Sequence, residues 1–580
     1  MRNLVALKAY LLRYPRKLAL GVAANFGMAI VGLASPVVIG RAVDALSLQV
    51  TERTLLFYGS LLLGVAALQG LLSFTQRMTL VALSRDVEFD LRQEYFGQLL
   101  RLPLSFYQRN HTGDLMARGT NDLQAVRMVC GPAIMYTGST IFTGLGALAL
   151  MMHLHVGLTL VALATMPLVA LCTQVFGNRI HGLFVRVQEQ FAALSTRVQE
   201  NLSGARVVRA YARESSENAL FAELNQEYVG RSRRLIQWDS AFRPLLQLLV
   251  GVGFVAVLWY GGLLVIDGQL SVGQFVSFNF FLSKLVWPMI AIGWVINLAQ
   301  RGSASLGRIL EILSLVPEVR DEPPLVSEPD LRGAVRFDHL TFGYATGPDV
   351  LEQVSIDVPE GSTLALVGRT GSGKSTVLSL IPRLLDPPPG RVFVGGHDVR
   401  RLPLADLRSA IAVVPQETLL FSASIRDNIA FSREDATTEE VLAAASVAGL
   451  ESDLAELSEG LDTLVGERGV TLSGGQKQRV ALARALVREP RILLLDDCLS
   501  AVDTETEERI LRNLQREFIR RTVILVSHRV STARHADSIV VLDHGSILEQ
   551  GTHDELLSHE GGVYADLHRR QQLEDELAVV

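Results

Sequence analysis

Long apolar stretches without charged residues dominate the first 300 positions of the chain. A helix that crosses a bilayer needs roughly 20 consecutive apolar residues. Five stretches reach that length, and one of them is long enough for two spans broken near His153 and His155. The stretches are Leu18–Gly40, Thr54–Gln76, Met128–Asn178, Pro244–Ile266 and Ser271–Gln300, the last interrupted only by Lys284. The pattern therefore predicts six membrane-spanning helices.

The arginines between these spans predict an orientation in the membrane. The segment Arg77–Arg127 holds seven arginines and the segment Arg179–Arg243 holds ten. The other three loops hold only Arg41 and Arg53. Because cytoplasmic loops carry the excess of basic residues, we expect both long segments and both termini in the cytoplasm. The protein would then be a multi-pass protein of the inner (cytoplasmic) cell membrane.

The two arginine-rich segments are also expected to be helical. Apolar residues recur in the second segment at Leu183, Val187, Phe191, Leu194, Val198 and Leu202. This three- and four-residue spacing is typical of an amphipathic helix. Helices should therefore continue well beyond the bilayer, with short helices at their turns near Gly113–Leu115 and Ala210–Arg213.

The overall composition agrees with a membrane protein and argues against two other classes. Hydrophobic residues make up 49% of the chain and the mean hydropathy is +0.28. The net charge of −6 does not bear on nucleic-acid binding, but no basic tract occurs, so a nucleic-acid partner is not expected. The three cysteines lie far apart, which fits neither a disulfide framework nor a metal site.

A phosphate-binding loop follows the short apolar strand expected at Leu364–Val367. The sequence GRTGSGKST then leads into a helix that should begin at Lys374. Glycines let backbone amides curl around phosphate, and the helix N-terminus favours negative charge. We expect Lys374 to neutralise the β- and γ-phosphates of ATP and Ser375 to ligate Mg²⁺. The whole loop is expected to bind the nucleotide: Gly368, Arg369, Thr370, Gly371, Ser372, Gly373, Lys374, Ser375 and Thr376.

Further motifs follow at the ends of two other predicted strands. The continuous apolar run Ile492–Leu495 predicts a buried parallel strand. Asp496, at its carboxyl end, is expected to hold Mg²⁺ beside the phosphates. His528 follows the predicted strand Thr522–Val526 and could reach a phosphate oxygen.

A second glycine-rich motif predicts that the protein works as a pair of chains. It is the run LSGGQ, formed by Leu472, Ser473, Gly474, Gly475 and Gln476. One phosphate-binding loop handles one face of a nucleotide, so these backbone amides need a second chain to reach the other face.

Over essentially its whole length the chain resembles a half-transporter of the ATP-binding cassette (ABC) exporter superfamily. That resemblance implies a role for several further residues. Tyr344 would stack on adenine, Gln416 would link Mg²⁺ and water to the membrane domain, and His528 would sense the γ-phosphate. Asp503, in SAVD, would communicate across the dimer, and Val465–Gly469 would contact the membrane-domain linkers.

The domain organisation follows from these assignments. A Pro-rich and acidic segment, Leu315–Arg332, separates the apolar half from the nucleotide-binding half. The expected fold class is an all-α six-helix membrane domain followed by an α/β P-loop domain. In order, the parts are an amphipathic elbow helix at the membrane surface (1–17), a transmembrane domain with two long cytoplasmic extensions (18–314), a linker (315–332), an ABC nucleotide-binding domain (333–565) and a C-terminal helix (566–580).

One residue departs from the family pattern. A Glu normally follows the Mg²⁺-binding Asp and polarises the attacking water, whereas this chain has Asp497. The shorter carboxylate predicts a site that binds ATP and hydrolyses it poorly, because positioning errors of about 1 Å can cost on the order of 100-fold in rate.

An intact LSGGQ beside a weak site favours a heterodimer with a second half-transporter that carries the Glu. The resemblance is to asymmetric exporters such as the antigen-peptide transporter and TmrAB-like multidrug exporters, in which this chain would be the B half. The alternatives are a homodimeric lipid flippase or multidrug exporter, in which Asp497 is an adequate base, and an ATP-gated channel or regulatory subunit.

The substrate path is the least specified part of the prediction. A charge inside the bilayer is expensive and usually functional, which draws attention to Lys284. Phe278, Phe281 and Trp287 could line the same path, while Lys284 could instead snorkel or pair with a carboxylate of the partner. The resemblance implies export of hydrophobic drugs, lipids or peptides by alternating access, and the sequence does not choose among them.

Overall fold

The computed structural model describes residues 2–48, 51–327, 329–331, 333–344, 347–466, 472–502, 504–518, 521–559 and 561–579. It consists of two compact units. The helical unit comprises residues 1–100 and 112–315, and the α/β unit comprises residues 101–111 and 316–580. The expected fold class, an all-α membrane domain followed by an α/β P-loop domain, is confirmed.

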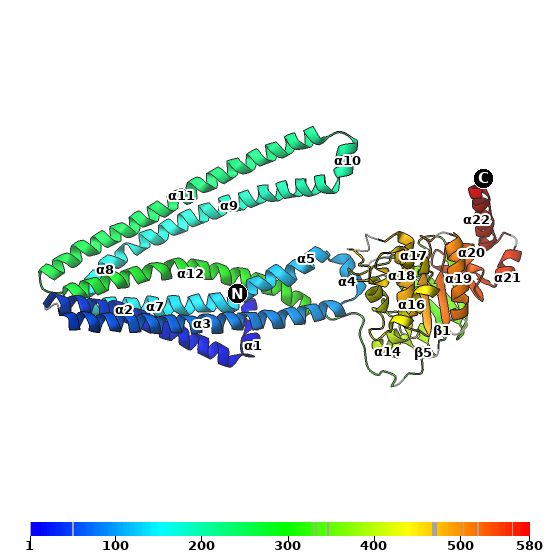
Figure 1. The fold of residues 1–580 in the computed structure, drawn as a ribbon, viewed down its shortest axis with the longest axis horizontal. Helices are drawn as coiled ribbons and strands as arrows, with labels where there is room; N and C mark the ends of the chain where they lie inside the picture. Colours follow the sequence, from blue (N-terminus) through cyan, green and yellow to red (C-terminus); the bar gives the residue numbers. More distant parts are fainter. Residues whose placement is uncertain are drawn as a thin grey trace. The chain divides into compact units, whose positions relative to one another are not determined.

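Six helical stretches of the helical unit are long and apolar enough to cross a membrane (Figure 1). Their elements are α2 (Pro15–Leu48), α3 (Glu52–Arg101), α5 (Thr112–Ala117), η2 (Arg118–Asp122), α6 (Leu123–Met128), η3 (Val129–Ala133), α7 (Ile134–Leu154), α8 (Val156–Ala164), α9 (Met166–Ser203), α11 (Glu214–Ile266) and α12 (Val272–Leu313). The third stretch joins α5 to α7, and the fourth joins α8 and α9.

The predicted break between the third and fourth spans lies at His155. Its backbone is extended, with φ −163° and ψ 115°, and its Nδ1 accepts a hydrogen bond of 3.0 Å from the Leu158 amide. This contact caps the start of α8, because the first amides of a helix have no partner within the helix.

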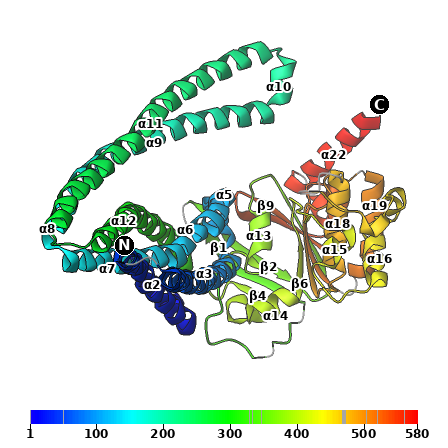
Figure 2. The same ribbon diagram turned by 60° about the vertical axis from the view of Figure 1, so that its left-hand side comes forward.

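The helices of this unit form two groups. α12 packs on α2 and α7, and α9 packs along α11. Figures 1 and 2 show α9 and α11 side by side as a long hairpin that turns at α10 (Ala205–Ala210). Long extensions are therefore present, as the spacing of apolar residues predicts.

The turns of the extensions contain short helices at or near the expected residues, and α5 (Thr112–Ala117) includes Gly113–Leu115. A further short helix, α4 (Leu104–Arg109), precedes α5, and α10 ends at Ala210, the first residue of the expected Ala210–Arg213. Pro103 stands at the N-cap of α4 and Gly204 at the N-cap of α10. Proline and glycine favour positions where one helix stops and the next starts, so these two residues mark where α4 and α10 begin.

The N-terminal segment is less regular than a single amphipathic helix. It forms η1 (Arg2–Ala6) and α1 (Leu7–Leu11) before α2 begins at Pro15. Two of its cations pair with acidic side chains of α3: Arg13 with Asp90 and Glu94, and Lys17 with Asp86. These ion pairs hold the segment against α3, while the side chains of Arg13 and Lys17 stay 48% and 46% exposed.

The ends of α2 and α12 are joined by an unusually close contact. The Asp44 carboxylate accepts hydrogen bonds of 2.7 Å from the Ser271 hydroxyl and the Gly273 amide. A Cβ added to Gly273 would lie 2.0 Å from the carbonyl oxygen of Gly40 and 2.6 Å from the Asp44 carboxylate. Only glycine at position 273 allows this approach of the two backbones.

Gly273→Ala should therefore destabilise the helical unit. Overpacking of this kind typically costs about 1–3 kcal/mol, and the shift would also disturb the Asp44 contacts. Gly293→Ala on the same helix is the matched control, because its Cβ would meet nothing within 4 Å and alanine favours a helix by about 1 kcal/mol. Thermal unfolding of the purified chain in detergent should show a lower Tm for Gly273→Ala and no decrease for Gly293→Ala. Equal Tm values for the two variants would contradict the close contact.

The α/β unit contains two sheets. The six-stranded sheet has the order β10-β9-β3-β8-β7-β6 and is parallel except at β10, while the four-stranded sheet has the antiparallel order β2-β1-β4-β5. Its strands are β1 (Val335–Gly343), β2 (Asp349–Val358), β3 (Thr363–Gly368), β4 (Val392–Val394), β5 (His397–Asp398), β6 (Ile411–Val414), β7 (Ile492–Asp496), β8 (Thr522–Val526), β9 (Ser538–Asp543) and β10 (Ser546–Gly551).

Short helices and turns complete the unit. They are α13 (Lys374–Leu380), η4 (Val399–Arg401), α14 (Leu404–Ser409), α15 (Ile425–Ala430), α16 (Thr438–Val447), α17 (Glu451–Glu456), η5 (Gly460–Asp462), α18 (Gly474–Leu486), α19 (Thr504–Phe518), α20 (Val530–Ala533), α21 (His553–Ser558) and α22 (Val563–Val579). The strands β3, β7 and β8 are buried on both faces, which explains their unbroken apolar runs.

Candidate nucleotide-binding and catalytic site

The predicted ATP-handling residues lie at one edge of the parallel sheet. β3, β8, β7 and β6 are neighbours, and the chain leaves their carboxyl ends at Gly368, Ser527, Asp496 and Pro415, respectively. Ligands of open α/β sheets bind outside the carboxyl ends of the strands. The sheet order therefore gathers the P-loop, the Asp496–Asp497 pair, His528 and Gln416 along one edge.

The phosphate-binding loop has the backbone that its glycines permit. Gly368 and Gly373 have φ of 154° and 98°, values that side chains rarely allow. A Cβ at Gly368 would lie 2.1 Å from the carbonyl oxygen of Leu542, and one at Gly373 would lie 2.6 Å from the Leu351 side chain. The loop then enters α13 at Lys374, as predicted.

Lys374 lies inside its own loop. Its Nζ donates hydrogen bonds of 2.8 Å to the Gly368 carbonyl and 2.7 Å to the Arg369 carbonyl, and the residue is only 5% exposed. Burial lowers the pKa of the ammonium group, and the charges of Asp496 and Asp497 act in the opposite direction. The buried ammonium would gain from a phosphate at this position, since these carbonyls are weaker partners than an anion.

Ser375 and Asp496 provide a donor set that fits Mg²⁺. The Ser375 hydroxyl donates a hydrogen bond of 3.1 Å to Oδ1 of Asp496. Mg²⁺ prefers oxygen ligands and is usually held by one or two protein groups together with substrate phosphates. Burial raises the pKa of the Asp496 carboxyl, the Ser375 hydrogen bond lowers it, and the nearby charge of Asp497 raises it. A bound divalent cation would offset the free-energy cost of keeping the Asp496 carboxylate ionised.

Asp496→Asn should stabilise the nucleotide-free protein while removing a Mg²⁺ ligand. A raised carboxyl pKa means that the folded state loses stability as pH rises from the ordinary value of about 3.9 through the raised one. The neutral amide avoids this cost, which comes mainly from burial of the carboxylate. Differential scanning fluorimetry at pH 8 should give a higher Tm for the variant, and the gain should shrink as the pH is lowered. A lower Tm at pH 8 would contradict the electrostatic argument.

Asp497 has a strained but well-anchored backbone. Its φ is +45°, its amide donates a hydrogen bond of 3.0 Å to the Val526 carbonyl, and its carbonyl accepts one of 2.9 Å from the Ser500 hydroxyl. Asp is one of the few residue types enriched at positive φ. The side chain therefore starts from a fixed position beside the P-loop edge of the sheet.

The region after His528 holds two residues that the sequence analysis missed. Arg529 forms an ion pair with Glu507, which is 3% exposed. The Thr532 hydroxyl donates a hydrogen bond of 2.6 Å to the same Glu507 carboxylate. Arg529 also donates a hydrogen bond of 3.4 Å to the Ser500 carbonyl. The network ties the segment containing His528, whose own side chain is exposed, to the segment following Asp497. The acidic first turn of α19 was the available signal.

The LSGGQ residues are fixed by contacts within their own chain, and two of them are exposed. Ser473 caps α18 and forms a capping box with Gln476. The side-chain amide of Gln476 also donates a hydrogen bond of 2.9 Å to the Asp453 carboxylate. Leu472 is buried, whereas Ser473 and Gly474 are exposed. Within the described ranges, no hydrogen bond joins these residues to the P-loop of the same chain.

The remaining predicted nucleotide ligands lie near the same edge or outside the described residues. The Tyr344 side chain is 45% exposed, and its hydroxyl lies 3.1 Å from the Thr376 hydroxyl at the end of the P-loop. Gln416 is exposed just after β6. Asp503 and residues 467–469 of the predicted Val465–Gly469 contact lie outside the described residues.

The predicted substrate path needs a correction. Phe278 and Phe281 are each 1% exposed and pack in the core of the helical unit with Met151, Leu158 and Val257. They therefore do not present an open aromatic surface together with Lys284. Trp287 is 56% exposed and Lys284 is half-buried, so these two candidates remain at the surface of α12.

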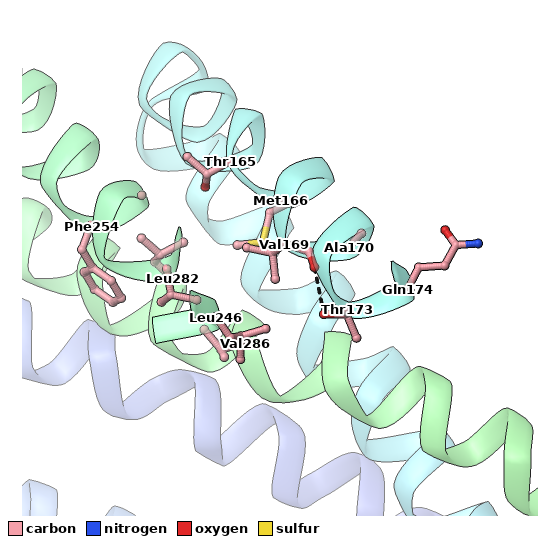
Figure 3. A pocket seen from close by; sticks show the side chains of 12 residues that line it. Thr165, Met166, Val169, Ala170, Thr173, Gln174, Leu246, Phe254, Leu282 and Val286 are labelled. Carbon is pink, nitrogen blue, oxygen red and sulfur yellow. Dashed lines mark hydrogen bonds between the residues drawn. The ribbon is translucent and has the colours of Figure 1, made fainter. Parts of the chain in front are cut away.

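An apolar pocket lies on another side of α12. It has a volume of about 240 Å³ and is lined by Thr165, Met166, Val169, Ala170, Thr173 and Gln174 of the fourth span, by Leu246, Val250, Gly253 and Phe254 of α11, and by Leu282 and Val286 of α12. In Figure 3 the amide of Gln174 points away, and the Thr173 hydroxyl is bonded to the Val169 carbonyl at 2.8 Å. The pocket thus offers apolar surface and few free polar groups.

Taken together, a six-span helical unit and a P-loop ATPase unit in one chain define an ATP-driven membrane transporter. The chain belongs to the ABC transporter family: residues 18–289 match the family described as ABC transporter transmembrane region, and residues 351–500 match the family described as ABC transporter. It is therefore an ATP hydrolase coupled to transport and a multi-pass membrane protein.

Its relatives include drug and lipid exporters. It is 40% identical to the probable multidrug resistance ABC transporter ATP-binding/permease protein YheI of Bacillus subtilis, over 98% of this chain and 96% of that protein. It is 37% identical to the multidrug resistance-like ATP-binding protein MdlA of Escherichia coli, over 100% of this chain and 98% of that protein. An ATP-dependent lipid A-core flippase of Syntrophus aciditrophicus is 34% identical over 87% of this chain and 84% of its own length.

A solved structure agrees over the whole fold. The structure of a bacterial Atm1-family ABC exporter with ATP bound superposes with a TM-score of 0.77 at 29% identity and covers 96% of this chain and 98% of that chain. The chain therefore belongs to the multidrug and lipid exporters of this family.

Proposed function

We propose that the chain is one half of a heterodimeric, TmrAB-like exporter that moves hydrophobic compounds out of the cytoplasm. The observation that carries the proposal is Asp497, a shortened carboxylate beside an otherwise complete P-loop and Mg²⁺ donor set. The chain's own ATP site would bind nucleotide and hydrolyse it slowly. Its intact LSGGQ would complete a faster site on the P-loop of a partner that carries Glu.

Two features support a second chain. The exposed Ser473 and Gly474 have no bond to the P-loop of their own chain among the described residues. The tip of the α9–α11 hairpin exposes apolar side chains, with Leu202 at 74%, Val207 at 60% and Tyr211 at 76% exposure. A solvent-exposed hairpin tip of this kind suits a contact with another subunit.

The chemistry at this chain's site would be shared among its own residues. Lys374 would bind the β- and γ-phosphates, Ser375 and Asp496 would hold Mg²⁺ with Gln416 nearby, and Tyr344 would stack on adenine. When bound, Mg²⁺ supplies charge neutralisation on the phosphates. Asp497 would orient water weakly, and His528, positioned through Arg529, would contact the γ-phosphate.

The arginine distribution supports a cytoplasmic location for both termini, the long extensions and the ATP domain. The membrane would be a bacterial inner membrane. ATP would bring two nucleotide-binding domains together, the long helices would transmit this closure, and the substrate cavity would open to the outside. Hydrolysis at the partner's P-loop would reset the cycle.

A homodimeric lipid flippase is the second candidate. The similarity to the lipid A-core flippase and the apolar pocket beside α12 favour it. In that case Asp497 would serve as an adequate base in both sites.

ATPase assays of the purified chain, alone and with a candidate partner half-transporter, separate the two. Little activity alone and strong activity together would support the heterodimer. Robust activity of the chain alone would overturn it in favour of the homodimer.

A further inference from the structure

One side of α12 carries a cation among aromatic rings. Phe280, Lys284, Trp287 and Trp294 are separated by four, three and seven residues, so they share one side of the helix. Phe280, Trp287 and Trp294 are 43%, 56% and 41% exposed. Tyr136 of α7 adds a fourth ring, with centroid distances of 4.8 Å to Trp294 and 6.4 Å to Trp287.

Lys284 lies deep in the sixth span. It follows the N-cap Ser271 of α12 by thirteen residues, which corresponds to about 20 Å along a helix. In the part of the chain that the structure describes, it makes no hydrogen bond or ion pair. A charged side chain at this depth is costly against acyl chains and normally faces a cavity or an opposite charge. This side of α12 is therefore suited to an anion brought by something other than the chain itself.

We propose that Lys284, Trp287, Trp294 and Tyr136 form a binding site for amphiphilic organic anions, namely compounds with an aromatic or planar apolar body and a single carboxylate or sulfonate. The inference rests on the proposed export function and specifies the substrate class of that path. The ammonium group would pair with the anionic head. The rings would stack on the body in offset or edge-to-face geometry.

The positive charge of Lys284 favours amphiphilic anions over cationic and neutral hydrophobic compounds. Aromatic rings alone also attract cations, but the Lys284 ammonium repels a cation held at the same rings. Neutral compounds would gain the stacking without the ion pair. The apolar pocket lined by Leu282 and Val286 lies on another side of α12 and has no charged residue in its lining, so it cannot supply a preference for anions.

Three probes with one aromatic body test the site directly: pyrenebutyrate, pyrenebutanol and pyrenebutylamine. The purified full chain in phosphatidylcholine nanodiscs would be titrated with each probe, following energy transfer from tryptophan to pyrene, with empty nanodiscs subtracted. We expect pyrenebutyrate to bind about tenfold more tightly than the other two, a difference that one modest ion pair supplies. Lys284→Met should reduce this preference to within about twofold, whereas Lys284→Arg should keep it.

Two further variants locate the site. Trp294→Leu should weaken all three probes together, because it removes a ring and no charge. Val250→Phe, which fills the apolar pocket, should leave the anion preference unchanged. Thermal unfolding of each variant would show that the fold is retained.

Several outcomes would overturn the proposal. These are equal affinities for the three probes or no binding at all, a preference that survives Lys284→Met, and loss of binding in Val250→Phe alone. Loss of the preference when a partner chain is added would show instead that Lys284 pairs with a partner carboxylate. Because binding is measured without ATP, a failure of the export proposal would appear separately, as absent ATPase activity of the complex.

Discussion

Replacing Asp497 with Glu is expected to raise the rate of ATP hydrolysis at this chain's own P-loop by on the order of 100-fold. The extra methylene would move the carboxylate toward the attacking water by roughly one C–C bond. Position errors of about 1 Å can cost a factor of this size in rate.

The surrounding structure explains why the shorter side chain cannot compensate by itself. The Asp497 amide is bonded to the Val526 carbonyl, and its carbonyl is bonded to Ser500. The Glu507–Arg529 pair holds the neighbouring segments together. The backbone therefore cannot move toward the phosphate to recover the missing length. Glu is less favoured than Asp at a φ of +45°, but this cost falls on stability rather than on the reach of the carboxylate.

The measurement is single-turnover hydrolysis of ATP by the assembled complex in which the partner's P-loop has been inactivated. Asp497→Asn is the control, because it keeps the length and removes the charge. It should change the already slow rate by less than about threefold. A large fall with Asn, together with no gain with Glu, would mean that Asp497 is already a competent base.

The membrane spans and the ATP-binding edge could be predicted from the sequence because each rests on local information. A bilayer demands long apolar runs, and a P-loop demands glycines at Gly368 and Gly373 whose positions are readable in a short motif. The strands β3, β7 and β8 were likewise marked by continuous apolar residues.

The errors concern information that is not local. Within an all-apolar span, periodicity does not reveal which side faces the protein core, so Phe278 and Phe281 were assigned to the substrate path although they are buried. The Glu507–Arg529 pair joins residues 22 positions apart, and Tyr136 meets Trp294 from another helix. Such contacts depend on how the elements pack, which no single segment specifies.

Ser473→Arg should abolish the ATPase activity of the complex, at least about 100-fold, whereas Lys374→Ala should reduce it by less than about tenfold. The asymmetry follows from the proposed division of work. Ser473 opens the exposed LSGGQ motif that completes the partner's fast site, and Lys374 serves only the slow site. In a homodimer every site would contain both residues, and the two variants would be equally inactive.

Loss of the helix cap must be separated from loss of the nucleotide contact. Ser473 caps α18 with Gln476, and a substitution there costs about 1 kcal/mol of stability. Thr552 caps α21 through the same kind of capping box with Glu555, so Thr552→Arg imposes a similar structural cost away from the motif and should keep the ATPase activity. Steady-state ATPase rates of the three variants, each paired with the unmodified partner, provide the measurement. If Lys374→Ala is as inactive as Ser473→Arg, this chain's own P-loop is as necessary for turnover as its signature motif, and the proposed division of work is wrong. If only Ser473→Arg is inactive, this chain contributes its signature motif to catalysis more than its own P-loop.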